Sequence, residues 1–522
     1  TSTVIGSGVT INAGGLNITG VMTATTFEGS GASMTGVAMT ITPMAYNPDV
    51  SDSTVSDTTG IGITFDHRIL AGSGNVTLSV ATNAGAAGTT VENFGVGSSV
   101  TIAGRKASIT PSSSLTEGDT YHISYPSGAF TNTGGDVDYV GTAYTFGVVK
   151  YSRELYIWGS NAYGGLGLNQ AHALKISSPT QIPGTNWSFI TISGSYNTVH
   201  ALKTDGTMWS WGKNTDGDLG QNQASPSLPA VSSPVQIPGT TWASVTNGRR
   251  SEMATKTDGT LWGWGSNTYG NLGNNNRTNY SSPIQIPGTT WSTEIGKITA
   301  GVTVHYAIKT DGTLWTMGGN QNGHLGLSQP GATYISSPTQ IPGTTWKWIQ
   351  TCNYQTFATK TDGTLWSWGY NGRGQLGVND KISRSSPTQI PGTTWQSIGT
   401  TKFNTGNIFF ATKSDGTLWG WGTPYEGSLG LNTANPGYYS SPVQVPGTTW
   451  STDKKFGSGS SGTLGLKTDG TMWAWGKNQE GSLGQNNRTQ YSSPVQIPGT
   501  TWIQSAAAAP YNKAVSAAIK KS

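Results

Sequence analysis

The chain has 522 residues, of which 34% are apolar and only 10% are charged, and it contains 74 glycines. Low charge with abundant glycine would suit a disordered chain, but 20 Trp, 20 Tyr and 11 Phe supply enough apolar surface for folded cores. No run of 18 apolar residues is present, so the sequence predicts no membrane insertion. The single cysteine, Cys352, excludes an internal disulfide framework and a cysteine-based zinc site.

Charge is distributed unevenly along the chain. Residues 1–150 hold four Lys or Arg and ten Asp or Glu, whereas residues 151–522 hold 25 basic and 15 acidic residues. Six of these lysines belong to a repeated Lys-Thr/Ser-Asp-Gly turn, where the neighbouring Asp cancels the charge. The other basic residues are scattered and form no polybasic tract, so we expect no nucleic-acid partner, while an anionic surface polymer would fit.

Residues 1–45 consist of short β-like runs punctuated by glycine. A segment of this size can hardly bury a core alone, so we expect it to intertwine with identical copies as a homotrimeric β stalk. The stretch 20–36, from Gly-Val-Met-Thr to Ser-Met-Thr-Gly, resembles linker repeats in fibre proteins of tailed phages, especially those that infect cyanobacteria. The resemblance implies a fibre stalk.

Residues 46–149 show the alternating pattern of a small β-sandwich, with runs separated by Gly, Ser and Asn turns. The runs are 61–65, 76–80, 100–102, 121–125 and 144–146. The segments Ile63–Asp66 with Ala71–Leu78, and Leu115–Tyr121 leading to Gly128–Phe130, resemble bacterial Ig-like domains of surface proteins. Such a module implies a spacer.

Residues 150–522 contain an internal repeat. The pattern Leu/Met-Trp-x-Trp-Gly anchors at Trp158, Trp211, Trp264, Met317, Trp368, Trp421 and Trp475, at intervals of 51–54 residues. The pattern Pro-Gly-Thr-x-Trp carries Trp187, Trp242, Trp291, Trp346, Trp395, Trp450 and Trp502. Both series count seven, so the sequence predicts seven similar units.

Each repeat is predicted to be a β structure of four short strands. In Ala201–Gly212 two alternating segments flank an Asp-Gly turn, which favours a type I′ hairpin because Gly tolerates positive φ. Four short strands cannot bury their faces alone, but radial stacking can, so we predict an all-β chain with a seven-bladed β-propeller over 150–522. Residues 154–158 and 517–521 align with the two strands of one such hairpin, so we expect their pairing to close the ring.

The stretch 258–273, Asp-Gly-Thr-Leu-Trp-Gly-Trp-Gly-Ser-Asn-Thr-Tyr-Gly-Asn-Leu-Gly, resembles the propeller repeats of the regulator of chromosome condensation family. The resemblance covers residues 151–522 and implies a seven-bladed propeller with binding roles. The founding member exchanges nucleotide on a small GTPase and binds chromatin. No basic tail or exchange wedge is evident in this sequence, so that activity is not carried over.

The aromatic, acidic and histidine residues that suggest chemistry are explained mainly by the repeat. Nineteen of the 20 Trp occupy repeated positions and are predicted to be framework, while Trp348 is off register and is a candidate ligand platform. Six repeated Asp sit beside Gly in tight turns, which predicts a turn role rather than a metal site. The six His show no metal-ligand spacing, and no catalytic motif stands out, so we expect no metal, no cofactor and no enzyme activity.

Binding residues are expected where the repeats differ. One variable set precedes the Ala-x-Lys strand of each repeat, and the same loop of every blade should converge at one axial face. With Trp348, the candidate ligand-binding residues are Tyr196, Asn197, Arg249, Arg250, Asn353, Tyr354, Asn407 and Tyr511. A second variable set lies between Leu-Gly and Ser-Ser-Pro, as in 221–231 and 328–335. Neutral drift of exposed loops would give the same pattern.

We therefore expect a non-enzymatic virion fibre or adhesin-like protein whose propeller engages a host-surface glycan or receptor, alongside other virion structural proteins. A bacterial cell-surface or secreted adhesin is an alternative with a similar build. Two other classes stay open: an intracellular regulatory propeller, which would not be expected to carry residues 1–150, and a polysaccharide depolymerase borne on a fibre. The depolymerase would need an acid pair at a cleft, and the acid-poor propeller sequence offers none.

Overall fold

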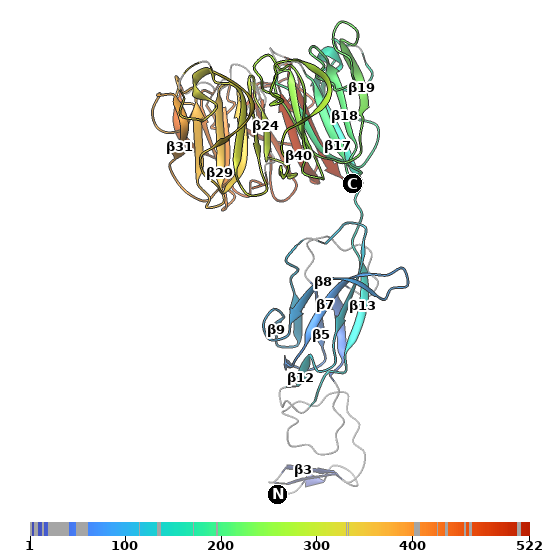
Figure 1. Ribbon diagram of the computed structural model, residues 1–522. Helices are drawn as coiled ribbons and strands as arrows, with labels where there is room; N and C mark the ends of the chain where they lie inside the picture. Colours follow the sequence, from blue (N-terminus) through green and yellow to red (C-terminus); the bar gives the residue numbers. More distant parts are fainter. Residues whose placement is uncertain are drawn as a thin grey trace. The chain divides into compact units, whose positions relative to one another are not determined.

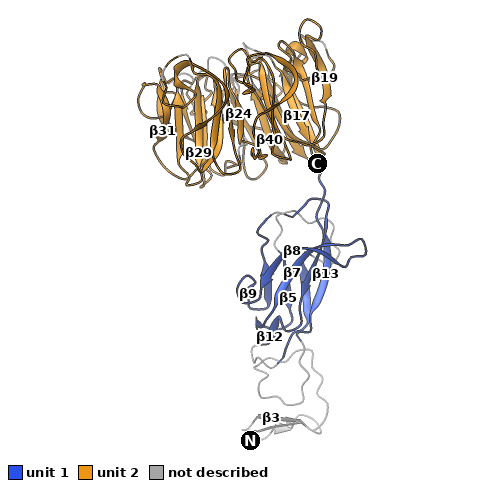
Figure 2. Cartoon of the chain, viewed as in Figure 1, with its two compact units in different colours: residues 1–151 blue, residues 152–522 orange. Residues whose placement is uncertain are grey.

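The protein is described by a computed structural model whose chain forms two compact units, Thr1–Tyr151 and Ser152–Ser522 (Figure 2). The residues that the structure describes are 3–4, 9–12, 15–18, 41–48, 61–113, 115–132, 137–170, 172–194, 197–329, 331, 333–400, 408–424, 426–433, 437–453, 456–458, 462–508 and 513–522. Within these residues all regular structure is β except for two short 3₁₀ turns, η2 (Ala162–Gly164) and η3 (Gln321–Gly323). The all-β prediction is confirmed. In the same residues no helix is long and apolar enough to cross a membrane.

Among its described residues, the first unit contains two four-stranded antiparallel sheets and two smaller ones. Their strands are β1 (Thr3–Val4), β2 (Val9–Asn12), β3 (Gly15–Ile18), β4 (Pro43–Asn47), β5 (Ile61–Phe65), β6 (Ile69–Ala71), β7 (Asn75–Ala81), β8 (Ala87–Gly95), β9 (Thr101–Ala103), β10 (Lys106–Ile109), β11 (Thr120–Tyr125), β12 (Phe130–Asn132) and β13 (Thr142–Gly147). The sheet orders are β1-β2-β3, β4-β5-β10-β9, β13-β11-β7-β8 and β12-β6.

The core of the first unit follows the alternation in its strands. Every second residue of β11 is buried, and Tyr121, Ile123 and Tyr125 pack in one cluster with Ile61 and Ile63 of β5. The alternating runs in the sequence coincide with or overlap strands of the structure. Strand β8 was not predicted, because its first five residues are all exposed and show no alternation.

The second unit contains seven four-stranded antiparallel sheets within its described residues. One sheet joins both chain ends: β15 (Lys175–Gln181), β14 (Arg153–Ser160), β41 (Val515–Lys521) and β40 (Trp502–Ala508). The next sheet consists of β16 (Trp187–Ile192), β17 (Val199–Lys203), β18 (Met208–Lys213) and β19 (Ala230–Ile237). It is followed by the sheet of β20 (Trp242–Asn247), β21 (Ser251–Lys256), β22 (Leu261–Gly265) and β23 (Tyr280–Ile286). The fourth sheet consists of β24 (Ile298–Ala300), β25 (Val304–Ile308), β26 (Leu314–Gly319) and β27 (Tyr334–Ile341). The last three are β28 (Trp346–Cys352), β29 (Gln355–Lys360), β30 (Leu365–Gly369) and β31 (Arg384–Ile390); β32 (Trp395–Thr400), β33 (Ile408–Lys413), β34 (Leu418–Gly422) and β35 (Tyr439–Val445); and β36 (Phe456–Ser458), β37 (Gly462–Leu466), β38 (Met472–Gly476) and β39 (Tyr491–Ile497).

We number the strands of each sheet from the inner edge, so that the first strand is β16 in the sheet β16–β19 and β40 in the sheet that joins the chain ends. Neighbouring sheets of the second unit pack against each other through these first strands. The strands β16, β20, β24, β28, β32, β36 and β40 each contact the next, and β40 also contacts β16. The contacts therefore return to their starting point. Figure 1 shows the sheets standing side by side in this unit.

The hairpin between the second and third strands of a sheet is held by one repeated turn. In the sheet β16–β19, Asp205 Oδ1 accepts hydrogen bonds from the Thr207 amide at 2.9 Å and the Thr207 hydroxyl at 2.7 Å, while Gly206 takes φ 78°. The same Asp–Thr bonds form at Asp258, Asp311, Asp362, Asp415 and Asp469. The repeated Asp residues thus act as turn acceptors, for which a short acidic side chain beside Gly is suited.

The sheet that joins the chain ends has no such turn, because its second and third strands come from opposite ends of the unit. Strand β14 pairs antiparallel with β41, with Glu154 opposite Lys520 and Trp158 opposite Ser516. Beyond the ladder, Ser152 and Ser522 exchange two backbone hydrogen bonds of 3.0 Å. The chain therefore enters the second unit at the end of the sheets that carries the Asp-Gly turns.

Candidate functional site

The two variable loops of each repeat lie at the same end of its sheet. Successive strands alternate in direction, so the loop from first to second strand and the loop from third to fourth strand emerge together. The Asp-Gly and Pro-Gly-Thr turns lie at the other end. We call the end with the variable loops the loop face, and it is opposite the end at which the chain enters the unit.

Buried asparagines shape the loops between third and fourth strands. The Asn161 side-chain oxygen accepts the Leu166 amide at 3.0 Å, and its nitrogen donates to the Gln170 carbonyl at 3.0 Å. Asn214, Asn267, Asn320, Asn371 and Asn478 make the same pair of bonds, to a Leu amide five residues on and to a carbonyl nine residues on. All six are at most 1% exposed, so each loop is fixed from within by one amide side chain.

In five of the repeats, the residue before the glycine of the Asn-x-x-Gly motif, which reads Pro-Tyr-Glu-Gly at 424–427, contacts the next sheet; we call it the seam residue. Its five observed contacts are Tyr163 with Lys213 (4.6 Å, cation over ring), Asp216 with Arg250 (3.3 Å), Tyr269 with Tyr334 (ring centroids 5.9 Å), Glu426 with Lys477 (3.1 Å) and Glu480 with Lys175 (3.0 Å). Sequence reasoning missed these residues. Their signal was available, because they differ between repeats at a fixed place in a motif that recurs.

Exposed tyrosines gather on the loop face with basic side chains. Within the described part of the second unit, the tyrosines at least 36% exposed are Tyr334, Tyr354, Tyr370 and Tyr438, and all belong to loop-face segments. The Arg277 guanidinium lies 4.7 Å from the Tyr334 ring centroid, and the Lys381 ammonium lies 5.0 Å from that of Tyr438. Aromatic rings beside cations are suited to stacking on a ligand and to attracting negative charge.

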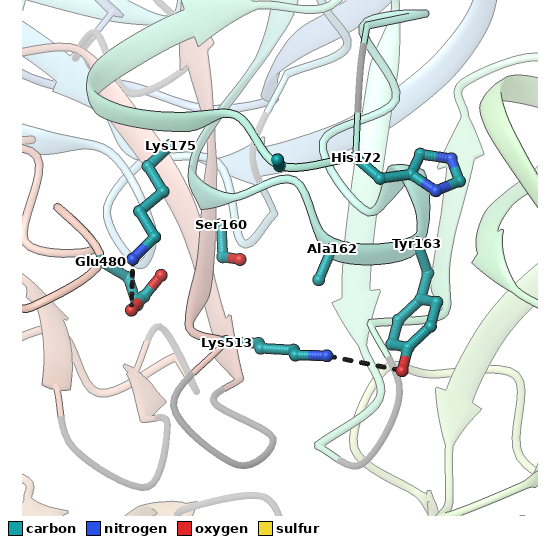
Figure 3. A pocket seen from close by; sticks show the side chains of 8 residues that line it. Ser160, Ala162, Tyr163, His172, Lys175, Glu480 and Lys513 are labelled. Atoms are coloured by element: carbon teal, nitrogen blue, oxygen red, sulfur yellow. Dashed lines mark hydrogen bonds and ion pairs between the residues drawn. The ribbon is translucent and has the colours of Figure 1, made fainter.

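A pocket of about 420 Å³ opens where the sheet of the chain ends meets its neighbour (Figure 3). It is lined by Ser160, Ala162, Tyr163, His172, Ala173, Lys175, Glu480 and Lys513. The Lys513 ammonium donates to the Tyr163 hydroxyl at 3.4 Å and lies 4.6 Å from the ring centroid. Lys175 pairs with Glu480 at 3.0 Å across the pocket wall. The volume falls within the range of small-molecule sites, about 300–1,000 Å³.

The candidate binding residues predicted from the sequence have different fates. Tyr196, Asn407 and Tyr511 lie outside the described residues. Asn197 is fully buried with φ 56°, so a ligand on the surface cannot reach it. Trp348 lies on β28 opposite Thr359, next to the Asp-Gly turn end, so the structure does not bring it together with the loop-face residues.

The remaining predicted residues do lie on the loop face. Arg249 and Arg250 follow β20 and are half-buried, and Arg250 is held by Asp216 in a seam. Asn353 and Tyr354 form the turn between β28 and β29, and Tyr354 is 36% exposed. The Tyr354 ring also lies 5.6 Å from the His324 ring. Of this group, Tyr354 and Arg249 are best placed to meet a ligand.

Buried titratable groups beneath the loop face are inaccessible to a substrate. Asp218 is 1% exposed, and burial, with a contribution from nearby Asp216, raises its pKa to about 7 against the opposing charge of Arg250. His305 is fully buried, accepts or donates to the Ser251 hydroxyl at 2.9 Å, and burial lowers its pKa to about 3. A group sealed in this way has no path to a glycosidic oxygen, so neither is a candidate catalytic acid.

Radially packed four-stranded sheets with a shaped loop face define a β-propeller, a class of scaffold that binds ligands and proteins through its loops. The chain belongs to the RCC1-like domain family, whose profile matches residues 124–517. Residues 37–148 match the profile of the bacterial Ig-like domain. The resemblances to the propeller repeats and to bacterial Ig-like domains are confirmed. The matched ranges begin at residue 37, so the resemblance of the first residues to phage fibres stays a prediction.

The relatives span several kinds of protein. The ultraviolet-B receptor UVR8 of Arabidopsis thaliana is 27% identical over 309 residues, which are 58% of this chain and 68% of the receptor. The human E3 ubiquitin-protein ligase HERC2 is 26% identical over 355 residues, which are 66% of this chain but 7% of the ligase. Yeast RCC1 (Prp20), solved bound to Kap60, has a TM-score of 0.59 at 18% identity and covers 71% of this chain and 90% of its own. Human WBSCR16 gives the same TM-score and identity and is covered over its whole length. The last two show a shared fold only.

Proposed function

We propose that this protein is a non-enzymatic attachment protein whose loop face binds a host-surface glycan or receptor. The observation that carries the proposal is the gathering of exposed tyrosines and basic side chains on this one face. The loop face is also opposite the end at which the chain enters the unit, so the preceding segment joins the unit away from the binding loops. The excess of basic residues in 151–522 favours a partner with negative charge.

The segments that precede the second unit suit a role in presenting this unit to a host surface. An Ig-like domain over 37–148 is a spacer in surface proteins, and residues 1–45 are proposed to form a homotrimeric stalk. In a virion fibre the stalk would also meet other virion structural proteins. A bacterial cell-surface or secreted adhesin has the same order of parts. Light scattering on the intact chain tests the stalk, since a stable monomer would contradict the trimer.

We also infer that the seven sheets are seven blades of one closed ring. The first strands contact one another in a circle, and β14 pairs with β41 from the opposite end of the unit. A closed ring leaves no sheet without a neighbour on either side. This arrangement would hold the loop face rigid and so reduce the ordering cost that its loops pay when a ligand binds.

An intracellular regulatory role is the second candidate, because relatives include an ultraviolet-B receptor, a ubiquitin ligase and an RCC1 protein. The activities that these names state are those of the relatives. The bacterial Ig-like domain disfavours such a role, since its resemblance to domains of surface proteins implies a spacer outside the cell. Affinity capture on a nucleotide-free small GTPase or on nucleosomes would support regulation, and capture on whole cells or glycans alone would support attachment.

The test of attachment uses the full chain on a glycan array and on a panel of intact bacterial cells. The triple variant Tyr334→Ala/Tyr370→Ala/Tyr438→Ala is expected to lose binding, whereas Val235→Ala/Ile295→Ala, which removes exposed apolar side chains outside the loop face, is expected to keep it. Full-length chain that binds no cell and no glycan would overturn the proposal. Shortening of a bound polysaccharide during incubation would show a depolymerase instead.

A further inference from the structure

The pocket on the loop face is built from distant parts of the chain. Ser160, Tyr163 and Lys175 belong to the β14–β15 segment near the start of the second unit, whereas Lys513 lies two residues before β41, near the end of the unit. Glu480 comes from the loop between β38 and β39 of the neighbouring sheet. The side chains of these residues point toward the same space in Figure 3. A ligand here would therefore touch both ends of the propeller segment.

The charge around the pocket is positive. Lys175 and Glu480 neutralise each other at 3.0 Å, and Glu480 is the acidic residue of the lining. Lys513 has no carboxylate partner among the described residues, and its ammonium instead lies 4.6 Å from the Tyr163 ring centroid. Lys213 lies at the same distance from that ring. The polar contact of the Lys513 ammonium is the neutral Tyr163 hydroxyl at 3.4 Å. A hydrogen bond to an anion would be stronger than this contact, because both partners would then be charged.

The shape of the pocket suits a sugar ring. Ala162 and Ala173 are small and leave the space open, Tyr163 forms one wall, and Ser160, His172 and Lys513 supply polar groups. Tyr163 is held at φ 59°, a conformation unfavourable for a bulky side chain, and two lysines flank its ring. A wall fixed in this way is ready before the ligand arrives.

We propose that this pocket binds a sugar unit that carries a carboxylate or sulfate group, with Lys513 as the main contact to the anion. The inference rests on the proposed attachment function and names the chemistry of its ligand. Because the ligand bridges the β14–β15 segment and Lys513, it also stabilises the pairing of the two chain ends. Binding to the folded state alone raises the unfolding temperature with ligand concentration.

The experiment compares charged and uncharged forms of the same saccharides on the full chain by calorimetry and thermal unfolding. The probes are oligogalacturonate and its methyl ester for the carboxylate, and sulfated and unsulfated dextran oligosaccharides for the sulfate. We expect one charged form to bind about tenfold or more tightly than its neutral partner, as loss of a charge-assisted hydrogen bond implies, and to raise the unfolding temperature.

Two lysine variants locate the binding site. Lys513→Met is expected to weaken binding about tenfold, so that about tenfold more ligand is needed for the same thermal shift, while Lys513→Arg keeps the affinity and the shift of the parent. Lys347→Met is the matched control, because Lys347 is a half-buried lysine on β28 whose ammonium bonds to Gln396, away from the loop face. Melting of each unliganded variant reports whether it folds.

The outcomes separate this inference from the attachment function. Equal binding of charged and neutral forms, no binding of any charged probe, or full binding by folded Lys513→Met would each overturn the pocket assignment. The attachment proposal would survive any of these results if the chain still bound cells through the tyrosines of the loop face. Failure of the chain on every cell and glycan would overturn both.

Discussion

Trp158 donates its indole N–H to the carbonyl oxygen of Ser482 at 2.8 Å, although 324 residues separate them in the chain. The same bond joins neighbouring sheets elsewhere: Trp211 to Gly165, Trp264 to Asp218, Trp368 to His324, Trp421 to Gln375 and Trp475 to Ser428. These indoles are fully buried, so an unpaired N–H would carry the full desolvation cost. The seam between the chain ends and the rest is thus tied by the same device as the other seams.

Removal of residues 517–522 is expected to destabilise the second unit sharply. The deletion removes most of β41, whose residues 517–520 pair with both β14 and β40, and it exposes two strand edges. Thermal unfolding of the full-length chain should show the transition of this unit at a markedly lower temperature. The control Lys521→Ala/Ser522→Ala keeps the backbone ladder and should melt like the parent; an unchanged transition after the deletion would refute the role of this pairing.

Asn267→Ala should cost about 1–3 kcal/mol in the free energy of unfolding, because the amides and carbonyls that Asn267 satisfies are left unpaired in a buried loop. Denaturant titration measures the loss. Gln285→Ala removes an exposed amide from the neighbouring strand β23 and should change the free energy little. Equal effects of the two substitutions would show that the buried amide does not fix the loop.

Acid should weaken the six Asp-Gly turns together. In Asp205, hydrogen bonds from the Thr207 hydroxyl and amide lower the pKa, and the equivalent bonds lower it at Asp258 and Asp311. A carboxylate with a lowered folded pKa stabilises the fold above its unfolded pKa, about 3.9, and loses that contribution as the pH falls through the folded value. Unfolding measured from pH 5 downward should show this slope, and replacing all six Asp by Asn should reduce it.

A second pH dependence is expected from buried histidine. Burial lowers the pKa of His305 to about 3, so between about pH 6.5 and 3 the unfolded chain binds a proton that the folded chain does not. Stability should therefore rise with pH across this window, by up to about 1.4 kcal/mol per pH unit. His324, with a pKa lowered to about 4 mainly by burial, adds a slope of the same sign.

The variant His305→Gln tests this assignment, because Gln can still bond to the Ser251 hydroxyl but does not titrate. Its unfolding free energy should depend less on pH between pH 6.5 and 4 than that of the parent. His172→Gln changes an exposed histidine and should leave the slope as it is. A slope that is the same in both variants would place the proton uptake elsewhere.

The lysines at the turn end are expected to stabilise the fold rather than bind ligand. Lys256 places its ammonium 4.9 Å from the Trp242 ring centroid and 4.1 Å from that of Trp262. Lys256→Met should cost about 1 kcal/mol, the usual scale of a partly exposed cation–π contact, and leave glycan binding unchanged. Loss of binding in a variant that melts like the parent would move the ligand to the turn end.

Much of the second unit followed from local patterns. The Asp205-Gly206 turn and the alternation around it indicated a hairpin, because turn chemistry and side-chain period act over a few residues. The alignment of residues 154–158 and 517–521 with one hairpin indicated which strands would be neighbours, and β14 and β41 do pair. Strand β8 escaped prediction, since a strand exposed along most of its length carries no hydrophobic period.

The candidate site depended on contacts that no local pattern encodes. Asn197 has a polar side chain suited to binding and stands in a variable loop, and yet it is buried. Lys213 and Lys513 both contact Tyr163 only because three separate segments of the chain come together. The sequence by itself determined the repeated sheets, their turns and the wealth of scaffold tryptophan, since each is set by periodic burial. Only the tertiary structure decided which loop side chains face solvent and which charges meet across a seam, because burial and Coulomb attraction there depend on distances between residues hundreds of positions apart.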